Sequence, residues 1–433
     1  MQLKRVAITG LGAVSPLGPD VKSTWQALMA KKSGMATIQQ FDASGFPVRF
    51  AAEVKNYQPG CYRTGKHHRF TMPFTQFSLD AASEALQDAG IHPKKSPNPA
   101  RFGVVTGSGM MTGDFNHLER FQKAAAPIGN ADWTALAAEG DAFYRLDDFG
   151  RTASNSGLSL LVQEFGITGY ANSVHTACAS GGQALGLAMQ VIQRGEADYM
   201  LAGGFDSMIN PLGVSSFCLL GALSSDNASP TTASRPFDGT RNGFVLGEGA
   251  AFLVLESFEK AKARGAHIYA ELAGVGNSLS SYRITDSHPN GDGAIQAIEG
   301  ALKSGGVGVS EVDYINAHGT STKMNDLSET NAIKAVFGEH AKHIPVSSTK
   351  SQTGHLIAAA GALEAVLSTL AIQHSKIPMT QNQTTPDAEC DLDYVADGPR
   401  DKALGAVLSN SFGFGGSNSC LLFKHPEFEA QGS

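Results

Sequence analysis

One cysteine of the sequence lies where a thiol could act as a nucleophile. Cys178 lies within TACASGG at 176–182, a turn that leads into a helix made almost wholly of small residues. The start of a helix stabilises a thiolate and lowers its pKa, and the glycines leave room for a substrate to reach the sulfur. Free cysteines are more often buried core residues. The interpretation of Cys178 as a nucleophile therefore depends on partners elsewhere in the chain.

Two histidines are candidates for such partners. His318 lies in NAHGTST at 316–322, just after an apolar run, and His355 ends STKSQTGH at 348–355, before a second helix of small residues. Strand ends in α/β sheets face the crevices that bind ligands. A lone histidine is more often a structural residue, but two at such positions beside a candidate nucleophile predict one site of Cys178, His318 and His355.

The elements that would position these residues alternate along the chain. Short β-rich runs occur at 5–9, 102–106, 199–202, 250–256, 269–275, 314–317 and within 406–423. Runs with helical period occur at 24–30, 183–193 and 293–303. This alternation predicts an α/β fold whose strands are mostly buried.

The two halves of the chain also echo each other. Segments 176–191 and 353–368 each place a polar, reactive residue before a helix rich in Ala and Gly. Because small side chains let two backbones approach closely, we expect these helices to pack together in the centre of the protein. A charged helical connector at 257–265 predicts a division into an N-terminal half, residues 1–260, and a C-terminal half, residues 261–433.

Composition sets the class of protein. Of 433 residues, 42% are hydrophobic and 17% charged, and the formal net charge of −7 gives nucleic acid no general attraction. The five cysteines contain no CxxC pair, so neither a disulfide framework nor a zinc knuckle is expected. The first residues are typical of a strand rather than a signal peptide, and the apolar stretch 355–372 contains Glu364, which makes it a poor membrane span. We therefore expect a cytoplasmic protein without a membrane partner.

Several catalytic motifs are absent or broken. Gly10 and Gly12 follow the first strand, but Ser15 replaces the third glycine of a dinucleotide fingerprint and Pro16 would interrupt its helix. The sequence contains no GxxxxGK(S/T) loop, no HExxH pair and no GxSxG elbow. These observations argue against NAD binding, nucleotide hydrolysis, zinc peptidase activity and esterases of the GxSxG type.

Four segments together resemble the β-ketoacyl-acyl carrier protein synthases: TACAS, NAHGTST, STKSQTGH and SNSFGFGGSN. The opening VAITGLGAVSPLG and the stretch SRPFDGTRNGFVLGEGA extend the resemblance over nearly the whole chain, specifically to bacterial elongating synthases of the second type. The resemblance implies a thiolase-like fold with a duplicated, five-layered αβαβα architecture. It also implies that Cys178 accepts an acyl chain from the phosphopantetheine thioester of an acyl carrier protein, with no other cofactor and no metal.

The same resemblance implies the later steps. His318 and His355 would hold the thioester carbonyl of malonyl carrier protein while carbon dioxide leaves, and the enolate would attack the acyl group on Cys178. This decarboxylative Claisen condensation gives a 3-oxoacyl carrier protein in fatty-acid elongation. Backbone N–H groups of Cys178 and Phe414 would stabilise the tetrahedral oxyanion, and the glycine turn at Gly413 would let the Phe414 ring gate the acyl chain.

Supporting residues follow from the resemblance as well. Lys350 would be buried and would need a carboxylate, for which Asp326 and Glu329 are the matching acidic residues, and the pair would hold the histidine loops. The remaining matches are Met110 and Phe217 for the acyl pocket, and the basic cluster with Arg63, Lys66 and Arg69 for the carrier protein. A homodimer is implied, and a heterodimer with a related subunit stays open.

Departures from the family pattern leave alternatives. Gly221 stands where many relatives have a carrier-binding arginine, Tyr170 replaces a common proline, and the polar segment 114–150 is expected to be a helical surface insertion. A ketosynthase of a type II polyketide or polyene pathway is therefore the runner-up. A non-catalytic chain-length factor normally lacks the cysteine that Cys178 supplies. A biosynthetic thiolase would need a second catalytic cysteine near the C-terminal glycine turn, where only Cys420 follows.

Overall fold

The computed structural model describes residues 3–60, 68–96, 98–109, 119–120, 122–123, 146–283 and 285–428. Arg63, Lys66 and Met110 lie outside the described residues, as does most of the segment 114–150. The part of that segment that is described at its end belongs to helix α6 (Leu146–Thr152).

Ten strands form the main sheet, in the order β10-β9-β13-β14-β8-β1-β7-β6-β4-β5. Their bounds in chain order are β1 (Val6–Val14), β4 (Phe102–Ser108), β5 (Ala171–Val174), β6 (Tyr199–Ser207), β7 (Glu248–Ser257), β8 (Ala270–Leu279), β9 (Tyr314–Asn316), β10 (Val346–Ser347), β13 (Ala406–Phe412) and β14 (Ser417–Lys424). Two short ribbons pair β2 (Ala36–Thr37) with β3 (Phe50–Ala51) and β11 (Lys376–Ile377) with β12 (Arg400–Asp401). Every run expected to be a strand lies in or overlaps one of these strands.

The two halves of the sheet repeat one pairing scheme. In the first half, β1–β7 and β7–β6 are antiparallel, whereas β6–β4 and β4–β5 are parallel. In the second half, β8–β14 and β14–β13 are antiparallel, whereas β13–β9 and β9–β10 are parallel. A short antiparallel pairing of β1 with β8, at Ala7–Glu271 and Ile8–Ala270, joins the halves. The predicted boundary between residues 260 and 261 falls within helix α10 (Phe258–Ala263).

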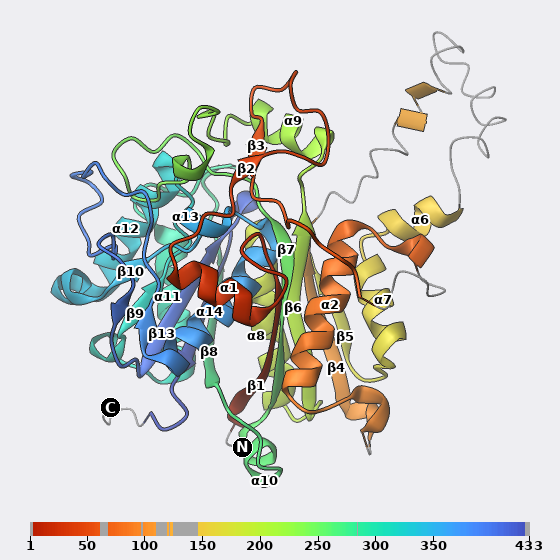
Figure 1. The fold of residues 1–433 in the computed structure, drawn as a ribbon. Coiled ribbons are helices and arrows are strands. Elements are labelled where there is room, and N and C mark those ends of the chain that lie inside the picture. The colour runs from red at the N-terminus through yellow and green to blue at the C-terminus, as the bar shows by residue number, and fades with distance from the viewer. Residues whose placement is uncertain are drawn as a thin grey trace.

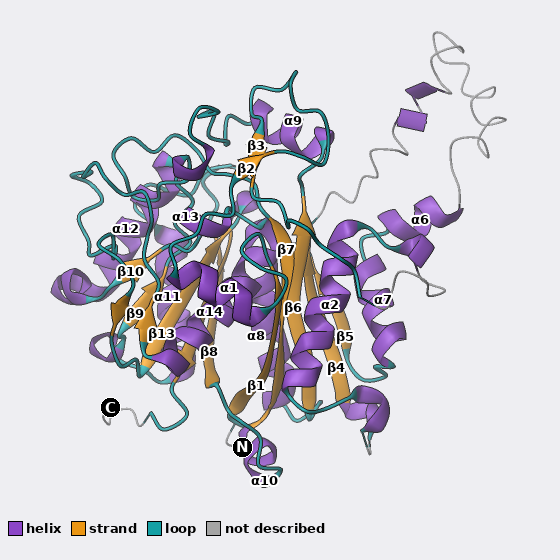
Figure 2. Ribbon diagram, in the orientation of Figure 1, coloured by secondary structure: helices purple, strands orange, loops and turns teal. Residues whose placement is uncertain are grey.

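Helices complete five layers around these strands (Figures 1 and 2). Helices α2 (Pro73–Asp88) and α7 (Ser156–Phe165) cover the outside of the first half, while α11 (Asp292–Gly305) covers the second half with α12 (Lys323–Phe337) beside it. Helices α8 (Ser180–Gln193) and α14 (Ala360–His374) lie between the halves and contact strands of both. Helices α1 (Val21–Met29), α9 (Pro211–Leu219) and α13 (Lys350–Thr353) also lie in the described part of the chain. The expected duplicated αβαβα fold is therefore confirmed.

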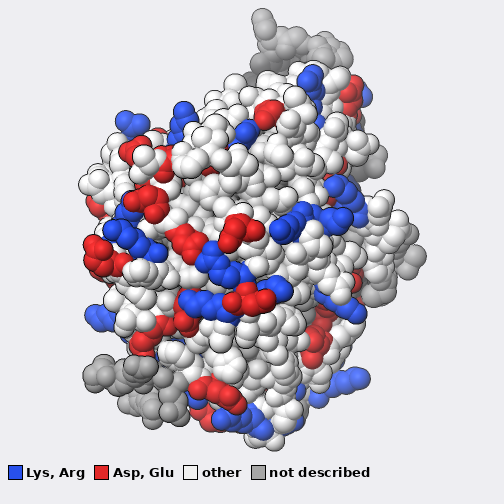
Figure 3. Space-filling view, turned by 60° about the vertical axis from the view of Figure 1, so that its left-hand side comes forward, with Lys and Arg blue, Asp and Glu red and all other residues white. Residues whose placement is uncertain are grey.

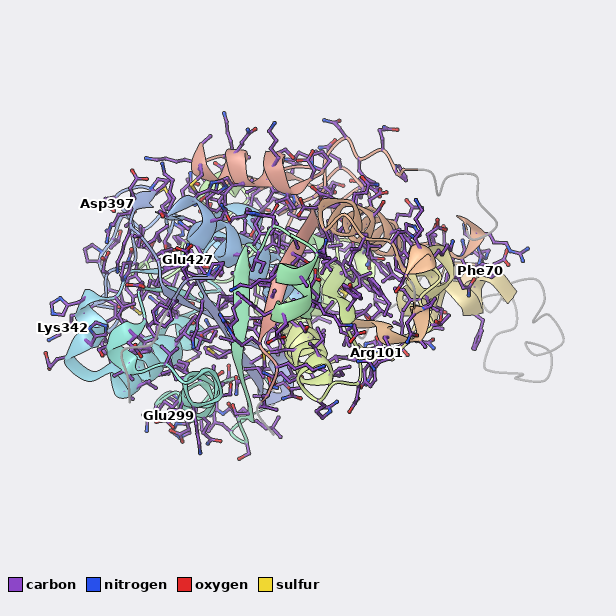
Figure 4. The ribbon with its side chains drawn as sticks, turned by 90° about the horizontal axis from the view of Figure 1, so that it is seen from below. Phe70, Arg101, Glu299, Lys342, Asp397 and Glu427 are labelled. Carbon is purple, nitrogen blue, oxygen red and sulfur yellow. The ribbon has the colours of Figure 1, made fainter. Side chains whose placement is uncertain are left out.

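The side-chain view from below also separates the halves. In Figure 4, Phe70 and Arg101 lie on one side of the molecule, and Glu299 and Lys342 lie on the other. On the face drawn in Figure 3, basic and acidic side chains are interspersed rather than gathered by sign. That face therefore presents no large field of one charge.

Small residues at the centre allow the predicted close approach of α8 and α14. A Cβ at Gly181 would lie 2.8 Å from the backbone nitrogen of Ala362, and one at Gly361 would lie 2.9 Å from that of Gly182. The stretch Ile357–His374 is long and apolar enough to cross a membrane, but 89% of it is buried inside the protein. The stretch is therefore the core of the fold, because its apolar side chains already have protein partners.

The Gly10-Leu11-Gly12 run also receives a structural explanation. A Cβ at Gly10 would lie 2.2 Å from the carbonyl oxygen of Ala85, and one at Gly12 would lie 1.9 Å from that of Ala81. Both glycines lie on β1 and let α2 pack directly on the strand. Their role is helix packing, which agrees with the argument against a dinucleotide site.

Candidate active site

Cys178 lies in a tight turn that delivers it to the start of a central helix. The turn is a short 3-10 helix, Ala177–Ala179, followed at once by α8. Ala177 has φ of +49°, a left-handed conformation that is strained for a residue with a Cβ. Cys178 itself is only 2% exposed. The fold therefore holds the sulfur in one place through a locally strained backbone.

Both predicted histidines meet this sulfur. His355 Nε2 lies 3.0 Å from Cys178 Sγ, and the rings of His318 and His355 are 5.2 Å apart at an angle of 83°. One ligand atom from each of the three residues lies within 4.8 Å of the others. His318 follows β9, while the backbone N–H of His355 donates to the carbonyl of Val245 at 2.8 Å. Three segments that are distant in the sequence thus form one cluster.

The protonation states differ from the expectation for the thiol. Burial raises the pKa of Cys178 to about 12, although the nearby charge of Lys350 lowers it. The expected lowering by the helix start is wrong, because the loss of water around the sulfur outweighs it. Burial, together with Lys350, holds the pKa values of His318 and His355 well below the usual 6.5. The resting site therefore holds a neutral thiol between neutral imidazoles.

Two backbone N–H groups converge on the sulfur. They belong to Cys178 itself and to Phe414, and both stabilise the thiolate form. A Cβ at Gly413 would lie 2.9 Å from the carbonyl oxygen of Thr176 and 3.2 Å from the backbone nitrogen of Cys178. Glycine at 413 therefore lets the Phe414 turn approach closely enough to aim its N–H at the site.

Buried carboxylates hold the His318 loop. Glu329 accepts the backbone N–H groups of His318 and Gly319, each at 2.8 Å, and Asp326 accepts that of Thr320 at 3.0 Å. Burial raises the pKa of Glu329 to about 6, against the lowering effect of these N–H donors. Neither carboxylate is among the residues that line the cavity at Cys178. Both carboxylates contact the loop backbone.

Lys350 has a different partner from the one expected. Its Nζ donates to Glu364 Oε1 on α14, rather than to Asp326 or Glu329. Helix α13 starts at Lys350 beside the central helices, which brings Glu364 within reach of the ammonium group. Burial raises the pKa of Glu364 to about 7, while Lys350 lowers it. Glu364 was visible in the sequence as the charged residue of an otherwise uncharged apolar stretch, but its partner was not.

A cavity of 460 Å³ opens onto the cluster. Cys178, His318, His355 and Phe414 line it, as do Leu220 and Met324, which are 53% and 37% exposed and so lie at its mouth. Gly221 lines the cavity as well.

Two of the expected binding residues, Phe217 and Arg69, do not line that cavity. Phe217 is not among the lining residues, but it packs 6.2 Å from the Phe414 ring in the apolar cluster that includes Cys178. The exposed Arg69 does not line the cavity, and it lies 3.7 Å from Asp147.

A second turn mirrors the first. Ile357 has φ of +48° just before α14, as Ala177 has just before α8, so Ala358 occupies the place that Cys178 has in the first half. Here the backbone N–H of Ala358 donates to Asp206 Oδ2 at 3.0 Å. Asp206 is buried at the end of β6, and burial raises its pKa to about 7. Asp206 could not be singled out from the sequence, because a single aspartate after a strand carries no distinctive pattern.

Comparisons with known proteins cover almost the whole chain. The family models for the beta-ketoacyl synthase N-terminal and C-terminal domains match residues 3–261 and 269–384. The 3-oxoacyl-[acyl-carrier-protein] synthase 2 of Coxiella burnetii is 42% identical over 98% of this chain and 99% of that protein.

Solved structures agree with those matches. A type II PKS ketosynthase, solved in complex with its acyl-carrier protein and bound to the hexaketide, is 36% identical with a TM-score of 0.87, over 98% of this chain and 100% of that one. A beta-ketoacyl synthase from Burkholderia phymatum is 32% identical with a TM-score of 0.88, over 98% of this chain and 99% of that one.

Proposed function

The chain belongs to the beta-ketoacyl synthase family, and from this premise we propose that Cys178, His318 and His355 are its catalytic residues. It is a 3-oxoacyl-acyl carrier protein synthase, an acyltransferase that extends acyl chains in fatty-acid biosynthesis. The chemistry uses no cofactor beyond the phosphopantetheine that carries its substrates. The observation that carries the assignment is the 3.0 Å contact between Cys178 Sγ and His355 Nε2 at the end of an open cavity.

The first half-reaction loads the enzyme. Sγ of Cys178 forms a bond to the acyl carbon, the bond from that carbon to the pantetheine sulfur breaks, and the thiol proton ends on the departing pantetheine. Because the thiol is protonated at rest, its proton must move as the sulfur attacks, and His355 Nε2 is placed to relay it. The N–H groups of Cys178 and Phe414 would stabilise the oxyanion of this step.

The second half-reaction forms the new carbon–carbon bond. His318 and His355, both neutral, would donate N–H bonds to the thioester oxygen of malonyl carrier protein as its carboxylate leaves as carbon dioxide. The enolate carbon then bonds to the acyl carbon, the bond to Cys178 Sγ breaks, and the released thiolate takes up one proton from the solvent, which restores the resting thiol. The products are a 3-oxoacyl carrier protein, carbon dioxide and the free enzyme.

The carrier protein must bind at the mouth of the cavity. A ketosynthase with 36% identity was solved with its acyl-carrier protein, which supports such a partner here. We propose Arg63, Lys66 and Arg69 as basic contacts for it, and Met110 and Phe217 for the acyl pocket. Gly221 adds no side chain at the mouth, so the contacts there come from Leu220 and Met324.

We further propose a homodimer in the cytoplasm. Strand β5 ends the sheet order, and its Ala171 and Asn172 are exposed, so the edge of β5 is available to a second copy of the chain. Light scattering on the full-length chain tests this assembly. A monomer at all concentrations would contradict it.

A ketosynthase of a type II polyketide pathway remains the second candidate. It is favoured by the likeness to the type II PKS ketosynthase noted above and by the absence of an arginine side chain at 221. The chemistry at Cys178 is the same in both pathways, and only the carrier and the acyl chain differ.

Intact-mass measurement after incubation with a series of acyl carrier proteins tests the proposal. The wild-type chain should gain one acyl group, Cys178→Ala should gain none, and Cys218→Ala, which removes the more exposed thiol, should load normally. The preferred chain identifies the pathway. Retained loading by Cys178→Ala would contradict the catalytic assignment, and failure of the wild type to load would indicate a non-catalytic subunit.

A further inference from the structure

The catalytic cluster has the composition of a metal site as well as of a condensing site. Among the described residues, Cys178, His318 and His355 are the group whose thiol and imidazole atoms lie within 4.8 Å of one another, and all three residues are buried. One sulfur and two nitrogen ligands suit borderline-soft cations such as Zn²⁺, whereas Mg²⁺ and Ca²⁺ prefer oxygen. We propose that these three residues bind Zn²⁺, and that the bound ion excludes acyl groups from Cys178. This inference concerns occupancy of the site and goes beyond the proposed condensation.

The geometry needs little change to accept the ion. Zn–S bonds of ~2.3 Å and Zn–N bonds of ~2.0 Å place the ligand atoms of a tetrahedral site about 3.5 Å apart. Sγ of Cys178 and Nε2 of His355 are already 3.0 Å apart, and the third ligand lies within the 4.8 Å limit. Side-chain rotations that move the sulfur and nitrogen atoms by a few tenths of an ångström up to about 1 Å would therefore place them at three corners of the tetrahedron. The fourth corner faces the 460 Å³ cavity, where a water molecule can complete the coordination.

The surrounding charges permit a cation. Lys350 is the nearby positive group, but its ammonium is paired with Glu364 on α14, which offsets part of its charge. The N–H groups of Cys178 and Phe414 stabilise the thiolate that the metal requires, and the bound cation supplies the rest of what burial of the sulfur costs. On binding, the S–H bond of Cys178 breaks, one Zn–S bond and two Zn–N bonds form, the proton leaves to the solvent and the ion keeps one of its waters. No electron is transferred.

The consequence is competition for one sulfur. An acylated Cys178 has no thiolate to offer, so the acyl-enzyme should not bind the ion. Zinc and the acyl donor should therefore exclude each other, and a chelator should restore loading fully. The free enzyme, and not the loaded enzyme, is the zinc-sensitive form.

Absorption spectroscopy with Co²⁺ as the probe tests the site without reference to turnover. The full-length chain should bind one equivalent, with the intense bands of four-coordinate Co²⁺ and a thiolate charge-transfer band, and one equivalent of Zn²⁺ should remove both. Cys178→Ala should lose the charge-transfer band, and His318→Ala and His355→Ala should each weaken Zn²⁺ binding by about tenfold or more. Cys218→Ala, the matched control, should retain the full spectrum, and Mg²⁺ should not compete.

Several results would overturn the proposal. They are a charge-transfer band that survives Cys178→Ala, a weak six-coordinate spectrum, or equal Zn²⁺ affinity in the free and acylated enzymes. If Cys178→Ala does not fold, the comparison of free with acylated wild type still decides the question. Since Co²⁺ binding is read without any acyl transfer, failure of the metal site and failure of the proposed condensation give different outcomes.

Discussion

Replacing Glu329 by glutamine should separate the position of His318 from the stability of the fold. Oε1 of Glu329 accepts the N–H of His318 and the side-chain amide of Asn410, while Oε2 accepts the N–H of Gly319. In Glu329→Gln, one oxygen becomes an NH₂ group. If the glutamine amide keeps its oxygen on the N–H groups of His318 and Asn410, its NH₂ group faces the N–H of Gly319, and two donors then point at each other.

Two effects on stability nearly cancel. A buried N–H without its partner costs about 1–3 kcal/mol. Burial of the charged group raises the Glu329 pKa from 4.5 to about 6, which corresponds to about 2 kcal/mol of unfavourable burial. The uncharged glutamine removes that penalty. The free energy of unfolding should therefore change by no more than about 1 kcal/mol.

The histidine loop has no such compensation. Gly319 has φ of +36° and directly follows His318, so loss of its anchor moves the ring. A displacement of ~1 Å costs about a hundredfold in rate. Malonyl decarboxylation should fall between about tenfold and a hundredfold. Acyl loading, which needs Cys178 and His355, should stay within about twofold.

The assays are release of carbon dioxide from malonyl carrier protein, intact-mass loading and urea unfolding. Glu84→Gln is the matched control, because Glu84 likewise accepts two backbone N–H groups, those of Ala13 and Val21 at 2.9 Å, although it is only partly buried, and it does not line the catalytic cavity. It should leave both reactions unchanged. Wild-type decarboxylation in Glu329→Gln, or equal loss of decarboxylation and loading, would refute the reasoning.

Three further outcomes are expected. Lys350→Met should lower the free energy of unfolding by about 3–5 kcal/mol, because it removes one partner of a buried ion pair and leaves the Glu364 carboxyl buried without it, and adding Glu364→Leu should recover much of the loss in urea unfolding; a double variant no better than the single one would contradict the pair. Decarboxylation should hold steady as the pH falls from about 8 to about 6.5, because pKa values well below 6.5 keep His318 and His355 neutral there, and a pH profile that falls with a midpoint near 6.5 would contradict that state. Gly12→Ala should lower the melting temperature and cost about 3 kcal/mol or more in the free energy of unfolding, since its Cβ would lie 1.9 Å from a carbonyl oxygen of α2. Gly45→Ala, whose Cβ would have nothing within 4 Å, should leave the melting temperature unchanged, and equal melting temperatures of the two variants would refute the packing role.

The sequence predicted the parts of the site that depend on local pattern. Cys178 and His355 precede small-residue helices, and His318 follows a strand. Their positions at helix starts and at a strand end could therefore be predicted from the local sequence pattern. The resemblance supplied the Phe414 turn, whose N–H the structure aims at the sulfur.

Long-range pairings could not be predicted in the same way. Lys350 pairs with Glu364, and Asp206 holds Ala358, because the packing of whole helices and strands brings these residues together. No spacing in the chain encodes that proximity. The thiol pKa was missed for a related reason: the helix start is local, but the exclusion of water around Cys178 is a property of the finished core.

The turn at Ile357, which matches the turn at Ala177, shows that one backbone shape can serve two different purposes in the same chain. In both halves, a residue with left-handed φ lies just before a central helix. The same backbone shape therefore occurs with a cysteine in one half and with an alanine in the other. In the second turn, the N–H of Ala358 donates to the carboxylate of Asp206. In the first turn, the corresponding N–H of Cys178 is directed at the sulfur. The first turn presents a thiol and the second is tied to a carboxylate, so both halves contribute side chains to the cluster but only the first contributes the sulfur.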